Sequence, residues 1–85
     1  MEISVDVPGY DPARGINLQW DEGFEIRVNV DANEVVIAAN AAGLRSLARH
    51  LLTMQQAEVP THAHVHLDAS KALEDGSAEL ILEKL

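Results

Sequence analysis

One segment of the chain, residues 40–56, constrains the fold more than any other because its apolar residues recur at helical spacing. Asn40 is a favourable N-cap at its start, and Pro60 closes the helical region. We therefore expect one amphipathic helix that packs on the rest of the domain through an apolar face. The face consists of Leu44, Leu47, Ala48, Leu51 and Leu52.

The opposite side of this expected helix is polar. Arg45 and Arg49 are one turn apart and flank the apolar face, while His50 lies on the far side with Ser46 and Thr53. We expect His50 to be solvated. The two arginines are candidates for contact with a binding partner.

Alternating apolar and polar residues before the helix predict β-strands. These patterns cover residues 3–7, 16–20, 24–30 and 35–39. The run DANE between the last two predicts a hairpin turn, because Asp31 and Asn33 favour local side-chain bonding and Asn tolerates a left-handed backbone. After the helix, residues 62–67 and 78–85 predict two more strands, and the loop between them is short enough for antiparallel pairing.

This order of elements predicts an α+β fold with two layers. One layer is a single antiparallel β-sheet of four to five strands, and the other is the amphipathic helix that covers its apolar face. A length of 85 residues suits a single domain, residues 1–85. With only three aromatic residues and no cysteine, we expect a mostly aliphatic core without disulfides.

The charge of the chain indicates what it does not bind. The formal net charge is −8, which disfavours nucleic acid and attracts a basic protein. The N-terminus has no basic and apolar leader, and no apolar run approaches the length that spans a membrane. We therefore expect a cytoplasmic protein that binds neither nucleic acid nor membrane.

The stretch THAHVHLD contains His62, His64 and His66 at alternate positions of an expected strand. Alternation places the three imidazoles on one face, and pairing with the last strand would set them beside Glu79 and Glu83. Imidazole and carboxylate groups are ligands for zinc, nickel and copper. These five residues are therefore the candidate metal ligands.

A solvated polar strand face explains the same pattern. Alternate residues of one flat strand are about 6–7 Å apart and diverge, whereas a zinc site needs convergent ligands and a second shell. We expect no cofactor, and only adventitious binding of zinc or nickel. The histidines then become candidates for partner contact, together with Trp20, a residue type common at interface hot spots.

Other chemistries lack their motifs. The chain has no glycine-rich phosphate loop, no nucleophile elbow and no recognisable Ser-His-Asp arrangement. We therefore expect a protein without enzymatic activity.

The run NAAGLRSLARHLLTMQQAEVPTHAHVHLD, followed by LEDGSAELILEK, resembles the immunity protein 32 family, predicted immunity proteins of bacterial polymorphic toxin systems. The resemblance covers the chain from about Leu18 onward. It implies an α+β protein that binds and neutralises a cognate toxin, without identifying that toxin or any functional residue. An acidic domain suits a basic toxin domain. The alternative function is a metal- or pH-responsive module that works through the histidine strand.

Overall fold

The computed structural model describes residues 1–85 and contains one helix and four strands. The elements are β1 (Ile26–Asp31), β2 (Glu34–Ala39), α1 (Ala41–Met54), β3 (His64–Leu67) and β4 (Leu80–Glu83). β1 pairs with β2, and β3 pairs with β4, each as an antiparallel hairpin. The α+β class is confirmed. The single sheet of four to five strands is wrong, since the hairpins form two separate two-stranded sheets.

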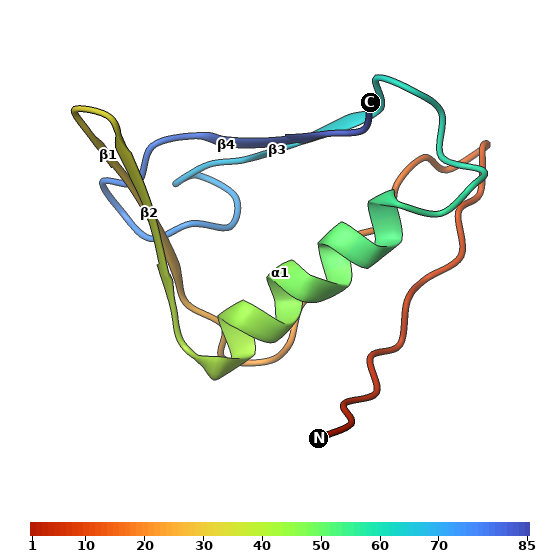
Figure 1. Ribbon diagram of the computed structural model, residues 1–85, viewed down its shortest axis with the longest axis horizontal. Helices are drawn as coiled ribbons and strands as arrows, with labels where there is room; N and C mark the ends of the chain where they lie inside the picture. The colour runs from red at the N-terminus through yellow and green to blue at the C-terminus, as the bar shows by residue number, and fades with distance from the viewer.

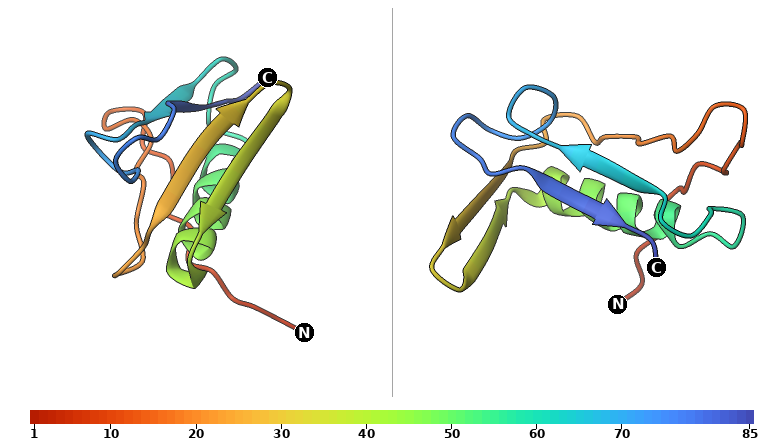
Figure 2. Two further views of the ribbon diagram at one scale, coloured as in Figure 1. Left: turned by 90° about the vertical axis from the view of Figure 1, so that its left-hand side faces the viewer. Right: turned by 90° about the horizontal axis from the view of Figure 1, so that it is seen from above.

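The two hairpins lie on different sides of the helix. The β1–β2 hairpin rises from the N-terminal end of α1, and β3–β4 lies across the molecule from the helix (Figure 1). Seen from above, β3–β4 lies over α1 and runs at an angle to β1–β2 (Figure 2). α1, the only helix, lacks the length and apolar character needed to cross a membrane.

The outer edge of β1 is occupied by the loop that precedes β4. The amides of Glu74 and Ala78 donate to the carbonyls of Ile26 (2.9 Å) and Val28 (2.8 Å), and the Val28 amide donates to Ser77 Oγ (3.1 Å). This loop blocks further strand pairing at β1. The strands expected at residues 3–7 and 16–20 are absent, and these residues form connections without regular secondary structure instead.

The core is small and aliphatic. Its fully buried members come from β1, β3 and the loop after β3, and half-buried residues of other segments pack around them. Among these are Trp20 and Phe24, whose rings stack at a centroid distance of 4.5 Å. The buried members of this cluster are Ile26, Val28, Leu67 and Leu73, and Met54 and Val59 are buried outside it.

The start of α1 is as expected, and its orientation is not. Asn40 Oδ1 accepts from the Gly43 amide at 2.8 Å, which confirms the N-cap. Most of the leucine face points to solvent, with Leu44 55% exposed and Leu51 56% exposed, while Leu47 packs against the core. The expected packing on the domain is therefore confirmed for Leu47 and wrong for the rest of this face. The buried helix residues are Gly43, Ser46, Arg49, His50, Thr53 and Met54.

Close packing at the start of the helix explains why its small and polar side turns inward. A Cβ at Gly43 would overlap the carbonyl oxygen of Glu25 and come within 2.9 Å of Ile26 Cγ1. Ser46 Oγ accepts from the Asp21 amide at 2.9 Å and donates to the Ala42 carbonyl. The inward face of α1 thus packs against the segment before β1 and the start of β1, and not against a broad apolar sheet.

The hairpin turn has an unexpected left-handed residue. β1 and β2 are joined by Ala32 and Asn33, as the DANE pattern predicts. Ala32 has a positive φ angle of 53°, whereas the φ angle of Asn33 is not positive. The expectation that Asn33 supplies the left-handed geometry is therefore wrong.

Candidate functional site

The predicted pairing of the histidine strand is confirmed. In the β3–β4 register, His64 lies opposite Glu83 and His66 lies opposite Ile81. Val65 and Leu67 lie opposite Leu82 and Leu80 on the other face. The outward side of this hairpin, which we call the histidine face, consists of His62, His64, His66, Glu79, Ile81 and Glu83.

Imidazoles and carboxylates meet in pairs on the histidine face. His66 Nδ1 lies 3.0 Å from Glu79, and His62 Nδ1 lies 3.4 Å from Glu83. His64 Nδ1 contacts the His62 carbonyl oxygen at 3.0 Å. No three His, Asp or Glu side chains converge on a point where they could hold a metal ion. The candidate metal ligands thus form two separate exposed pairs.

The start of the histidine strand has an unusual backbone. His62 has a φ of 72°, a left-handed value that residues with a Cβ rarely adopt. Its amide donates to the Lys84 carbonyl, and Lys84 in turn donates to the Ala63 carbonyl, which extends the β3–β4 pairing. This strained position aims the first histidine toward Glu83.

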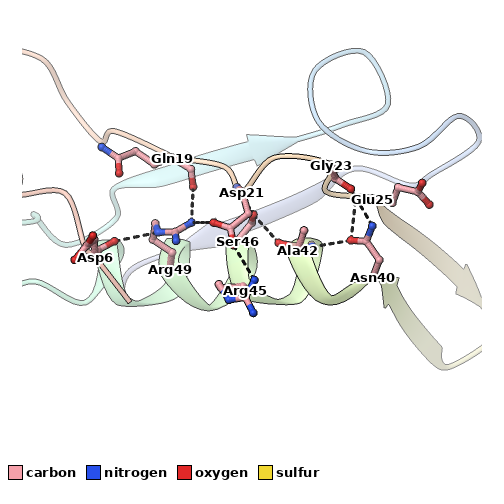
Figure 3. A network of polar contacts seen from close by, with 11 residues as sticks. Asp6, Gln19, Asp21, Gly23, Glu25, Asn40, Ala42, Arg45, Ser46 and Arg49 are labelled. Atoms are coloured by element: carbon pink, nitrogen blue, oxygen red, sulfur yellow. Dashed lines mark hydrogen bonds and ion pairs between the residues drawn. The ribbon is translucent and has the colours of Figure 1, made fainter. Parts of the chain in front are cut away.

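The two candidate arginines converge on one carboxylate. Arg49 contacts Asp21 Oδ1 at 2.6 Å and Arg45 contacts Oδ2 at 3.1 Å (Figure 3). Hydrogen bonds first from Arg49 and then from Arg45 hold the pKa of Asp21 below its ordinary value. Arg49 also donates to the carbonyls of Asp6 and Gln19. Its side chain is only 11% exposed, so Arg49 has a structural role here, whereas Arg45 is half exposed.

Trp20 and His50 meet under this network. The His50 ring packs edge-on to Trp20 at a centroid distance of 4.2 Å. His50 is fully buried and neither ring nitrogen has a hydrogen-bond partner. Burial, together with the Arg49 charge, lowers the pKa of His50 to about 4. The expectation that His50 is solvated is wrong, because the segment containing Trp20 covers this side of α1.

Comparison with known families identifies the chain. The sequence model of the immunity protein 32 family matches residues 34–85, more than half of the chain. The chain belongs to the immunity protein 32 family. This match confirms the resemblance, although it begins at residue 34 rather than near Leu18. No curated protein and no solved structure matches the chain.

The region that matches the family model covers β2, α1, β3 and β4. It therefore includes the whole histidine face and both arginines, and it leaves Trp20 and Asp21 outside. The family name denotes an immunity protein, whose partner in general is a toxin protein. Within the matched region, the histidine face holds five exposed ionisable side chains on and beside the paired strands β3 and β4.

Sequence reasoning missed several hydrogen bonds that join distant segments of this family member. Asn40, beyond capping α1, donates to the Gly23 carbonyl and accepts from the Glu25 amide. Gln56 donates to the Pro8 carbonyl at 2.9 Å. These bonds join residues 15 to 48 positions apart, so no local pattern could have indicated them. Only the N-cap preference of Asn40 was a visible signal.

Proposed function

We propose that this immunity protein is a non-enzymatic binding protein that neutralises a cognate bacterial toxin, with the histidine face as its contact surface. The observation that carries the proposal is the family match over residues 34–85, which contains that face in full. Binding requires a surface held in a fixed shape. Paired strands meet that requirement better than a loop does.

The chemistry of the histidine face suits a basic protein. Two carboxylates and three imidazoles share this face, and Ile81, 48% exposed, lies opposite His66. An apolar side chain surrounded by polar ones is a common arrangement of an interface core and rim. Because the chain carries a net charge of −8, a basic toxin surface would be attracted and would associate faster.

A second candidate function for the same residues is a response to bound metal ions. The pairs His66–Glu79 and His62–Glu83 each offer two donors, and the structure brings no third ligand to either pair. Two exposed donors hold zinc or nickel weakly compared with the three or four of an established site. The geometry therefore supports the protein-binding function better.

Co-expression with the toxin encoded by the neighbouring gene tests the proposal. We expect the parent chain to restore growth of cells that produce this toxin and to co-purify with it. The double variant Glu79→Lys and Glu83→Lys should lose protection, because it places two positive charges against a basic partner. A matched variant, Glu2→Lys and Glu58→Lys, changes the net charge equally at exposed positions that do not belong to the face. It should still protect.

Two results would count against the proposal. If the parent chain neither binds the toxin of the neighbouring gene nor relieves its toxicity, the proposed immunity function is refuted. If both double variants lose protection equally, overall charge explains the effect and the histidine face is not the contact surface. Circular dichroism of each purified variant establishes that it has folded.

A further inference from the structure

The chain exposes more surface than a compact monomer of its size. Its accessible surface is 5866 Å², whereas a folded monomer of 9.2 kDa exposes roughly 4900 Å². Its radius of gyration is 13.4 Å, against about 12 Å for a compact 85-residue domain. The excess is close to the ~800 Å² that one partner contributes to a standard protein interface.

Much of the exposed apolar surface belongs to α1 and β2. Five aliphatic side chains of these two elements are 42–63% exposed, and none of them is charged. Burial of five such side chains removes on the order of 400 Å² of apolar surface from water. That area approaches the apolar share, about 60%, of one side of a standard interface. The five residues, which we call the α1–β2 face, are Val35, Ile37, Leu44, Leu51 and Leu52.

The free edge of β2 adds unpaired backbone groups to this face. Ile26 and Val28 direct their carbonyls outward on β1, where the loop before β4 bonds them. Their register partners Ala39 and Ile37 therefore direct their backbone groups outward on β2. β2 pairs only with β1, so one edge of the hairpin is covered and the other is open.

The sequence of β2 lacks the features that protect an edge strand. EVVIAA is six residues long and contains no lysine, no proline and no inward-pointing charge. Such an edge is a ready template for pairing with another strand. It lies beside the N-terminal end of α1 in both views of Figure 2.

Charge distinguishes a second copy of the chain from other occupants of this face. Residues 34–57 contain one acid, Glu34, and two arginines, so they carry +1 while the rest of the chain carries −9. Two copies repel each other over most of their surfaces, and the α1–β2 region is where that repulsion is weakest. A strongly basic partner would be drawn elsewhere, toward the acidic surfaces.

We propose that the chain forms a two-fold symmetric homodimer through the α1–β2 face. The two β2 strands pair antiparallel across the symmetry axis, which extends β1–β2 into a four-stranded sheet with the strand order β1-β2-β2-β1. The leucines of both α1 helices pack on each other beside this sheet. Both copies contribute the same patch, as a closed two-fold interface requires. At the C-terminal end of α1 the dimer contact borders the histidine face, because Leu51 lines one groove with Ile81 and Glu83.

Sedimentation equilibrium of the full chain from 1 to 100 µM tests the dimer. We expect a mass of 18.4 kDa, twice the 9.2 kDa of the chain. Leu51→Glu and, separately, Ile37→Lys should weaken dimerisation at least 100-fold and leave a folded monomer, because both side chains are partly solvent-exposed in the single copy. Ile3→Glu alters another exposed aliphatic residue outside the face and should leave the dimer unchanged.

Amide hydrogen exchange identifies the interface. The outward amides of Val35 and Ile37 should exchange at least ten times more slowly at 100 µM than under dilute conditions where the chain dissociates. A parent mass of 9.2 kDa at 100 µM would overturn the proposal. A dimer that survives both Leu51→Glu and Ile37→Lys, or that leaves the β2 amides unprotected, would place the interface elsewhere and overturn it equally.

Discussion

At the scale of single residues, His50 is the group whose environment differs most from that of its type. Its ring is buried against Trp20, and both nitrogens lack partners. A buried polar group without hydrogen bonds costs stability even when neutral. Protonation costs more, because the charge would be desolvated next to Arg49. His50 is therefore an acid-sensitive position in the layer between α1 and the segment before β1.

We predict that His50 makes stability fall as the pH drops from 6.5 to 4. The folded pKa, about 4, lies below the unfolded value of 6.5, so the unfolded chain binds the extra proton first in this window. The shift corresponds to about 3 kcal/mol, fully retained above pH 6.5 and lost toward pH 4. In urea titrations, His50→Phe should remove this part of the pH dependence, whereas His64→Gln should retain it. A His50→Phe profile parallel to the parent's would refute the prediction.

Asp21 should produce a separate effect at lower pH. Its pKa is below the ordinary 3.8, so its stabilising effect is present above that value and is lost as the pH falls through the lower folded value. Asp21→Asn should therefore destabilise the chain at pH 7, and the difference from the parent should shrink below about pH 3.8. Asp11→Asn is the control, since its pair with Arg14 is long and exposed. A pH-independent difference would exclude the ion pairs as its cause.

At the scale of elements, the sequence predicted where structure forms better than how it packs. The α1 segment, the DANE turn and the β3–β4 pairing follow from local periodicity and capping, and all are present. The inward side of α1 was not predictable, because its partners are distant backbone carbonyls such as those of Asp6 and Gln19. Amphipathic spacing identifies two faces of a helix and does not say which one a connecting segment will cover.

Gly43 tests this packing of α1. Gly43→Ala should destabilise the chain by about 1–3 kcal/mol, since the new methyl group would overlap Glu25 and crowd Ile26. Helix propensity alone would predict the opposite, a gain of about 1 kcal/mol. Denaturant unfolding of Gly43→Ala measures the sign directly. Ala48→Gly, on the exposed side of α1, measures the effect of helix propensity alone. A Gly43→Ala variant that is more stable than the parent would contradict the close approach of Gly43 to Glu25 and Ile26.

Ala32 tests the hairpin turn. A left-handed φ costs a residue with a Cβ about 1–2 kcal/mol, and glycine avoids this cost. After the extra backbone entropy of glycine is subtracted, Ala32→Gly should raise the free energy of unfolding by about 0.5–1 kcal/mol. Ala57→Gly, at an exposed position without a positive φ, should not stabilise the chain. Thermal unfolding of both variants distinguishes the two results.

At the scale of the whole molecule, charge and apolar surface are segregated. The acids cluster outside residues 34–57, while the exposed leucines and valines of α1 and β2 lie within them. The proposed toxin contact and the proposed dimer contact therefore use neighbouring surfaces of different chemistry, which meet where Leu51 lines a groove with Ile81 and Glu83. Composition gives the acidic character, and the basic class of partner stays a prediction. It could not predict the open apolar face, because this depends on which side of α1 turns outward.

The central claim is that the chain binds its toxin through the histidine face, and calorimetric titration tests it most directly. We expect the purified chain to bind the toxin domain of the neighbouring gene with a Kd below 1 µM, weakening as salt screens the charges. Glu79→Lys with Glu83→Lys should weaken binding at least 100-fold, while Glu2→Lys with Glu58→Lys changes it less than 10-fold. Absence of binding by the parent, or equal affinity of both double variants, would contradict the claim.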